Sequence, residues 1–164
     1  MTALTPDARP TDAQPQTTRA RVALRWALAV AVAVFIFYMS SRTAGQLGGG
    51  FMGQLKQQLN LAINTMLGTA GDPMSVVAHF SEYLVLGLAL VNALRSHMGL
   101  GRACACAIAL ASAYAVTDEI HQIFVPGRYC DPADWLTDTL GASCGCGIYA
   151  LAHALQSKRN KRQA

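Results

Sequence analysis

Charged side chains are scarce in this sequence. They account for 13% of its 164 residues, whereas hydrophobic side chains account for 52%. Because an ordinary water-soluble domain carries about 25% charged residues, this composition excludes that class and favours an integral membrane protein. A chain of this length supplies one compact bundle and leaves no room for a second domain of normal size.

Four segments are long and apolar enough to cross a bilayer as helices, since about 20 residues span a hydrocarbon layer of about 30 Å. The sequence therefore predicts an all-α polytopic membrane protein with four transmembrane helices in a compact bundle. The first segment has an alternative interpretation as a signal peptide, but no good cleavage site follows it. The predicted spans are residues 22–40, 76–95, 103–124 and 135–155.

Lysine and arginine are distributed unevenly between the two sides of these spans. Arg95 and Arg102 lie between the second and third spans, and both ends of the chain are basic. The positive-inside rule places such segments in the cytoplasm, so residues 42–75 and 125–134 face outward. Anionic lipids explain the basic ends better than nucleic acid does.

The segments outside the membrane differ in character. Residues 1–20 are rich in polar residues and proline and are predicted to be a disordered cytoplasmic tail. Residues 51–70 carry apolar residues at helical spacing, which predicts an outward-facing amphipathic helix, either a plain connector or a lid over the bundle. The membrane domain then covers residues 21–157, and residues 158–164 form a basic cytoplasmic tail.

Ionisable residues gather at the outward ends of the last three spans. Helical spacing places them on one face of each helix, whereas Glu119 points away from His121 by about 160°. Because an unpaired carboxylate is costly inside a membrane, these groups are predicted to meet in a polar pocket. The predicted pocket consists of His79, Glu82, Asp118, His121, Asp134 and Asp138, with Gln122, Arg128 and Asp131 as ligand-binding residues.

Two local features support this arrangement. Asp131 and Pro132 suit the N-cap and first turn of the fourth helix, and Gly127 allows a sharp turn before them. Gly141 and Gly145 lie on the same stripe as Asp138, and this small-xxx-small spacing lets a neighbouring helix approach closely. The stripe therefore points into the bundle.

Three strings of this sequence resemble the VanZ-like family of small bacterial membrane proteins. They are HFSEY at residues 79–83, DEIHQIFVPGR at residues 118–128 and DWLTDTLGA at residues 134–142. The resemblance implies a multi-pass protein of the bacterial inner membrane with a role in the cell envelope, related to teicoplanin resistance. Many relatives carry lysine where this chain has Val76, and asparagine where it has Asp138.

The chemistry of the pocket leaves several functions open. A binding or structural module would recognise an envelope component or a glycopeptide-related ligand without turnover. An enzyme would act on a lipid-linked or cell-wall precursor with acid-base groups or a divalent metal such as Zn, Mn or Mg, although HExxH is absent. A proton-coupled carrier would require a homo-oligomer, and an interhelical network alone would serve stability. Membrane lipids are the expected surroundings in each case.

Overall fold

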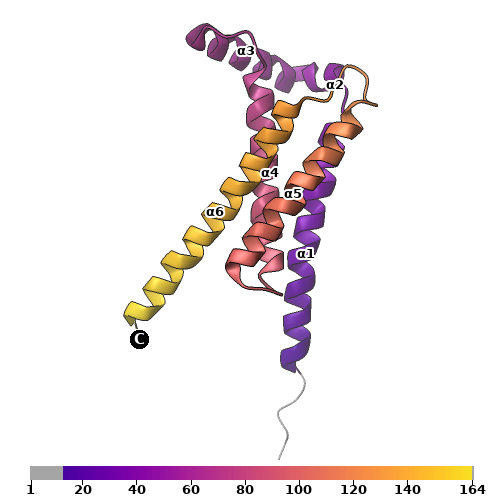
Figure 1. Ribbon diagram of the computed structural model, residues 1–164. Coiled ribbons are helices and arrows are strands. Elements are labelled where there is room, and N and C mark those ends of the chain that lie inside the picture. The colour runs from indigo at the N-terminus through magenta and orange to yellow at the C-terminus, as the bar shows by residue number, and fades with distance from the viewer. Residues whose placement is uncertain (1–12, 164) are drawn as a thin grey trace, which may run out of the picture.

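The computed structural model describes residues 13–163, which form a bundle of long helices with two helices across one end (Figure 1). The long helices are α1 (Ala13–Ser40), α4 (Pro73–Leu94), α5 (Leu100–Gln122) and α6 (Pro132–Gln163). The short α2 (Ala44–Gly48) and α3 (Gly50–Leu67) lie across the end where α1 finishes and α4 begins. The all-helical prediction is thereby confirmed for the described residues.

Within residues 13–163, three helices are long and apolar enough to cross a membrane, whereas the sequence predicted four. They are Arg19–Ser40, Pro73–Leu94 and Leu100–Gln122, which match the first three predicted spans. The fourth predicted span lies within α6, which is long enough but too polar, because Asp138 and His153 interrupt its apolar residues. On this criterion the structure supports three spans, and the predicted count of four is not confirmed.

Helices extend into both of the predicted tails. Residues 1–12 of the predicted disordered tail lie outside the described residues, but the chain is already helical from Ala13. The predicted basic tail at residues 158–164 is helical as far as Gln163. Lysine and arginine are good helix formers, so the helix continues past the last apolar residue.

Helix α4 is the centre of the bundle and packs against α1, α3, α5 and α6. Its closest neighbour is α6, because glycines remove the side chains between the two backbones. A Cβ atom at Gly141 would overlap the carbonyl oxygen of Phe80, and one at Gly145 would overlap that of Leu84. The predicted close approach at these two glycines is confirmed.

Helix α5 packs through a stripe of alanines. Ala103, Ala107, Ala111 and Ala115 follow one another at intervals of one helical turn, and each is fully buried. Small residues of this kind are typical of helix interfaces in membranes, where close backbone approach replaces the hydrophobic effect. The stripe aims the next turn of α5, at residue 119, into the bundle.

Caps and turns join these helices as the sequence leads one to expect. Asp72 caps α4 by accepting a hydrogen bond from the Ser75 N–H, and Pro73 occupies the first turn. Gly127 has a φ of 77°, a left-handed conformation that suits glycine. Asp131 accepts a hydrogen bond from the Ala133 N–H at 2.8 Å at the start of α6. The predicted turn and helix start are confirmed.

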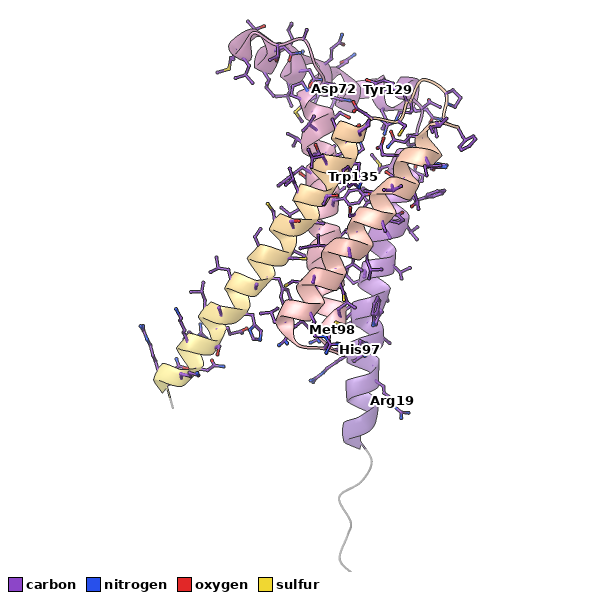
Figure 2. The ribbon with its side chains drawn as sticks, viewed as in Figure 1. Arg19, Asp72, His97, Met98, Tyr129 and Trp135 are labelled. Atoms are coloured by element: carbon purple, nitrogen blue, oxygen red, sulfur yellow. The ribbon has the colours of Figure 1, made fainter. Side chains whose placement is uncertain are left out.

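The predicted helix at residues 51–70 is also confirmed as α3. It is fastened to the start of α4 by Asn60, whose side chain donates to Asp72 and accepts from the Met74 N–H. Lys56 pairs with Asp72 at 2.6 Å. Figure 2 shows Asp72 and Tyr129 at this end of the bundle and His97 and Met98 at the opposite end. The segments predicted to face outward therefore share one end.

Candidate functional site

A small cavity lies beneath α2 and α3, against the ends of α1 and α5 and the start of α4. Its volume is about 310 Å³. Much of its wall is apolar and includes Met39, Leu47 and Met74. The polar part of the wall consists of Ser40, Lys56, Ser75, His79, Glu82, Asp118 and Arg128. The cavity can therefore accept an apolar group beside ionisable ones.

A larger and more polar cavity of about 460 Å³ adjoins it. The two cavities share Leu47, Lys56, Ser75 and Arg128 in their walls. The larger one is also lined by Gly48, Gly71, Asp72, Val76, Gln122, Gly127, Tyr129, Asp131 and Asp134. An amphipathic ligand could thus occupy both cavities, with its polar part in the larger one.

Two cations stand at the boundary between the cavities. Lys56 comes from α3, and Arg128 comes from the turn that Gly127 makes after α5. Among the described residues, the buried Nε of Arg128 has no hydrogen-bond partner, and no carboxylate pairs with this guanidinium. A guanidinium without a carboxylate partner is suited to bind a phosphate or carboxylate through two parallel hydrogen bonds.

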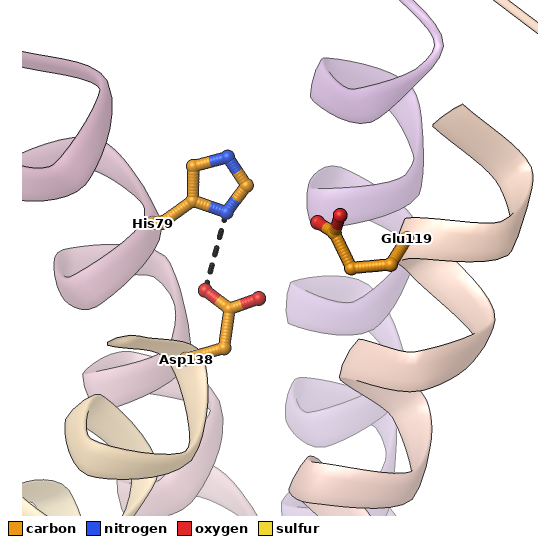
Figure 3. Close-up of side chains that lie close together, drawn as sticks. All are labelled: His79, Glu119 and Asp138. Carbon is orange, nitrogen blue, oxygen red and sulfur yellow. Dashed lines mark hydrogen bonds and ion pairs between the residues drawn. The ribbon is translucent and has the colours of Figure 1, made fainter. Parts of the chain in front are cut away.

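Beside the small cavity, His79, Glu119 and Asp138 form a buried cluster drawn from α4, α5 and α6. The three side chains each offer one ligand atom, and these atoms lie within 4.8 Å of one another. The Nδ1 of His79 lies 3.2 Å from the Oδ1 of Asp138 (Figure 3). The other ring nitrogen, Nε2, lies 3.8 Å from the Oδ2 of Asp134. These three residue types serve both as acid-base groups and as metal ligands.

Glu119 corrects the sequence-based pocket, which left this residue out. Its side chain is 3% exposed and its Oε2 accepts a hydrogen bond from the Asp131 N–H at 2.7 Å. The sequence holds a signal for this position, because Glu119 continues the buried alanine stripe one turn beyond Ala115. The angle between Glu119 and His121 relates only these two side chains to each other, whereas the alanine stripe identifies the face of α5 that is buried.

His121 lies on a different side of α5, facing the end of α1. Its Nε2 lies 3.0 Å from the Oγ of Ser41, and its ring centroid lies 4.6 Å from that of Phe37. His121 is not among the residues that line either cavity. The structure therefore places it beside the pocket, as a contact between α5 and α1.

The other predicted residues are brought to the same end of the bundle. Asp118 and Gln122 are buried, whereas Asp131 and Asp134 are partly exposed and line the larger cavity. Glu82 is partly buried and lines the small cavity. The structure thus gathers all of the predicted residues except His121 around two cavities or the cluster beside them.

Several buried polar atoms of this region have no hydrogen-bond partner within the described part of the chain. They are Ser40 Oγ, Tyr83 Oη, Asp118 Oδ1, Arg128 Nε and Asp138 Oδ2. Leaving a buried polar group unpaired costs roughly 1–3 kcal/mol, and more for a charged group. Such a concentration is typical of a site that exchanges partners with a ligand, ion or water.

Asp72, at the rim of the larger cavity, is stabilised as a carboxylate. Partial burial raises its pKa, but hydrogen bonds from Lys56, Asn60 and Ser75 outweigh that effect and hold the pKa below its usual value. The Lys56 ammonium also contributes through its charge. This ion pair fixes α3 over the cavities.

One comparison with known proteins agrees with the resemblance seen in the sequence. The family model described as VanZ/LLP1 matches residues 25–153, which include both cavities' ionisable residues and the buried cluster. No curated protein matches the chain, and no solved structure does.

Proposed function

Because the chain belongs to the VanZ/LLP1 family, we propose that it is a membrane protein of the bacterial cell envelope that binds a lipid-linked envelope component by its anionic headgroup. The observation that carries this proposal is the pair of adjoining cavities with Lys56 and Arg128 in both walls. The apolar wall of the small cavity suits the first carbons of a lipid chain. The two cations suit a phosphate.

The position of the cavities supports a ligand drawn from the membrane. They lie where α4 begins and α5 ends, which are the ends of two apolar helices. In the proposed topology this end faces outward, α6 forms a fourth span, and both ends of the chain are cytoplasmic. Helices α2 and α3 then act as a lid whose Lys56 contacts the bound headgroup.

A binding experiment tests the proposal with farnesyl phosphate as the probe and farnesol as its uncharged counterpart. Purified protein in detergent should bind farnesyl phosphate, and Arg128→Gln should weaken that binding about tenfold or more, since hydrogen bonds to charged groups contribute roughly 1.5–3 kcal/mol. Arg42→Gln is the matched control, because Arg42 lies over the Tyr38 ring and outside both cavities. Equal binding of farnesol, or equal loss in both variants, would contradict the proposal.

The cellular consequence we propose is reduced susceptibility to teicoplanin. In a susceptible strain, expression of the chain should raise the teicoplanin concentration that inhibits growth, and Arg128→Gln should remove this effect while the protein still accumulates in the membrane. Arg42→Gln should keep it. A protective effect that survives Arg128→Gln would separate resistance from headgroup binding.

A second function is favoured by the His79 and Asp138 pair. An imidazole held at 3.2 Å by a buried carboxylate is oriented for proton transfer, and His79 also lines the small cavity. The chain would then be a membrane-embedded hydrolase or transferase acting on the same lipid-linked ligand. Release of inorganic phosphate from farnesyl phosphate by the wild type, and its loss in His79→Gln, distinguishes this function from binding alone.

A further inference from the structure

The geometry points to a divalent transition-metal site formed by His79, Glu119 and Asp138, which we propose as a resident feature of this protein. The three residues come from three different helices and are 6%, 3% and 0% exposed. Their ligand atoms lie within 4.8 Å of one another. The site stands whether or not the cavities bind a lipid headgroup.

The charges of the cluster call for a cation. Two carboxylates and one imidazole are desolvated together, and within this cluster the imidazole offers at most one positive charge. Figure 3 shows the carboxylates of Glu119 and Asp138 turned toward the same space beside the His79 ring. A bound divalent ion would offset the repulsion between them and repay part of their desolvation.

Asp138 provides independent support. It is completely buried, yet its Oδ2 has no hydrogen-bond partner in the described part of the chain. Figure 3 shows the second oxygen of this carboxylate on the side of Glu119. A ligand bond to a cation would satisfy an oxygen that the described protein groups leave unpaired.

The surroundings hold two of the ligands in place. One oxygen of Glu119 accepts the Asp131 N–H at 2.7 Å, which orients the carboxylate. Nδ1 is the ring nitrogen of His79 that faces Asp138, so we assign Nδ1 as the ligand and Nε2–H as the group directed toward Asp134, 3.8 Å away. A metal-bound histidine usually directs its other ring N–H toward a carboxylate, a carbonyl oxygen or water, which fixes the tautomer and the orientation of the ring.

The donor set indicates which ions fit. One imidazole and two carboxylates suit Zn²⁺ or Mn²⁺ better than Ca²⁺ or Mg²⁺, which prefer oxygen ligands alone. Two ligand atoms of one tetrahedral Zn²⁺ ion lie about 3.4 Å apart. A separation as long as the 4.8 Å within this cluster must therefore shorten by about 1.4 Å when the ion binds. Three protein ligands leave a coordination position for water or a ligand oxygen, as in catalytic zinc sites.

Metal analysis of the full-length protein tests this site. A chelator first removes metal from the purified protein in detergent. The protein is then equilibrated with Zn²⁺ or Mn²⁺ and separated from unbound ion, and its metal content is measured by elemental mass spectrometry. We expect about one ion per chain for the wild type and at least a tenfold weaker affinity for Glu119→Gln and Asp138→Asn. Glu82→Gln makes the same chemical change outside the cluster and should retain the ion.

A second measurement guards against variants that fail to fold. Metal should raise the unfolding temperature of the wild type and of Glu82→Gln, because an ion that binds the folded state stabilises it. The proposed metal site would be overturned if the wild-type protein bound neither ion and gained no thermal stability. The cluster would then be a set of side chains that share protons and bind no metal. Equal loss of metal in Glu82→Gln and Glu119→Gln would also overturn it, because the effect would then be one of overall charge.

Discussion

At the scale of single residues, this protein buries ionisable groups where small side chains make room for them. Glu119 extends an alanine stripe of α5, and Asp138 lies one turn before Ala142 on the glycine face of α6. Burial of a carboxylate is costly unless it gains a partner. The His79 ring lies between two acidic residues of α6. Its Nδ1 is 3.2 Å from the Oδ1 of Asp138, and its Nε2 is 3.8 Å from the Oδ2 of Asp134. The faces of α5 and α6 that pack against the neighbouring helices therefore also carry the buried carboxylates of the cluster.

The Asp72 carboxylate predicts a pH-dependent attachment of α3. Since its pKa is lowered in the folded protein, the stabilisation is present above the unfolded value of about 4 and is lost as the pH falls through the folded value. A spin label at Leu61→Cys should therefore become more mobile at acidic pH. Lys56→Gln should move this transition to higher pH, whereas Lys158→Gln, an exposed change at the other end of the chain, should leave it unchanged. A transition that Lys56→Gln does not move would contradict the role of the ion pair.

At the scale of helices, the contact between α4 and α6 sets the position of the cluster. His79 and Asp138 can meet because Gly141 and Gly145 bring α6 against the backbone of α4 within the next two turns. Trp135 and Thr139 donate hydrogen bonds to Ser112 of α5, which attaches the other side of α6. The site is therefore assembled by α6, the helix with the weakest apolar character among the long helices.

Alanine substitutions along α6 test this packing. Gly145→Ala should lower the free energy of unfolding by about 1–3 kcal/mol, because its Cβ would overlap the Leu84 carbonyl oxygen. Gly147→Ala is the matched control, since nothing lies within 4 Å of a Cβ there. It should leave stability unchanged or raise it by about 0.5–1 kcal/mol. Thermal unfolding in detergent measures both, and equal stability would contradict the close contact.

At the scale of the whole molecule, the two cavities lie at one end of the bundle and the basic turn between α4 and α5 lies at the other. At that opposite end Arg25 donates to Ser96 at 3.0 Å, and Trp26 donates to His97 at 3.1 Å. The described ends of α1 and α6 lie on this side too (Figure 1). The positive-inside rule predicts this asymmetry for the proposed topology, in which the cavities face outward.

Labelling of single cysteines in intact cells tests the sidedness and the fourth span together. With the other cysteines replaced by serine, Cys130 should react with a membrane-impermeant maleimide from outside, because its side chain is exposed in the turn before α6. Desolvation, followed by the Glu119 carboxylate, raises the pKa of this thiol, so labelling should quicken as the pH rises. Gln163→Cys should react only after lysis. Reaction of both sites in intact cells would show that α6 does not cross.

The sequence by itself determined the helical class, three apolar spans, the turn at Gly127 and the end of the bundle at which the polar residues gather. These properties follow from hydropathy, helical spacing and turn chemistry, which act over short stretches of chain. Family membership was also readable from the contiguous strings around His79, Asp118 and Asp134, which lie within the residues that the family model matches.

Only the tertiary structure decided which of these polar groups meet. Spacing along α5 relates Asp118, Glu119 and His121 to one another but does not say which side faces the neighbouring helices. Packing of the alanine stripe turns Glu119 inward, and it leaves His121 against Ser41 and Phe37 of the α1 end. Close approach at Gly141 then brings Asp138 to His79. Contacts between helices that are far apart in the chain decide which polar groups meet, because only these contacts determine which face of each helix is buried.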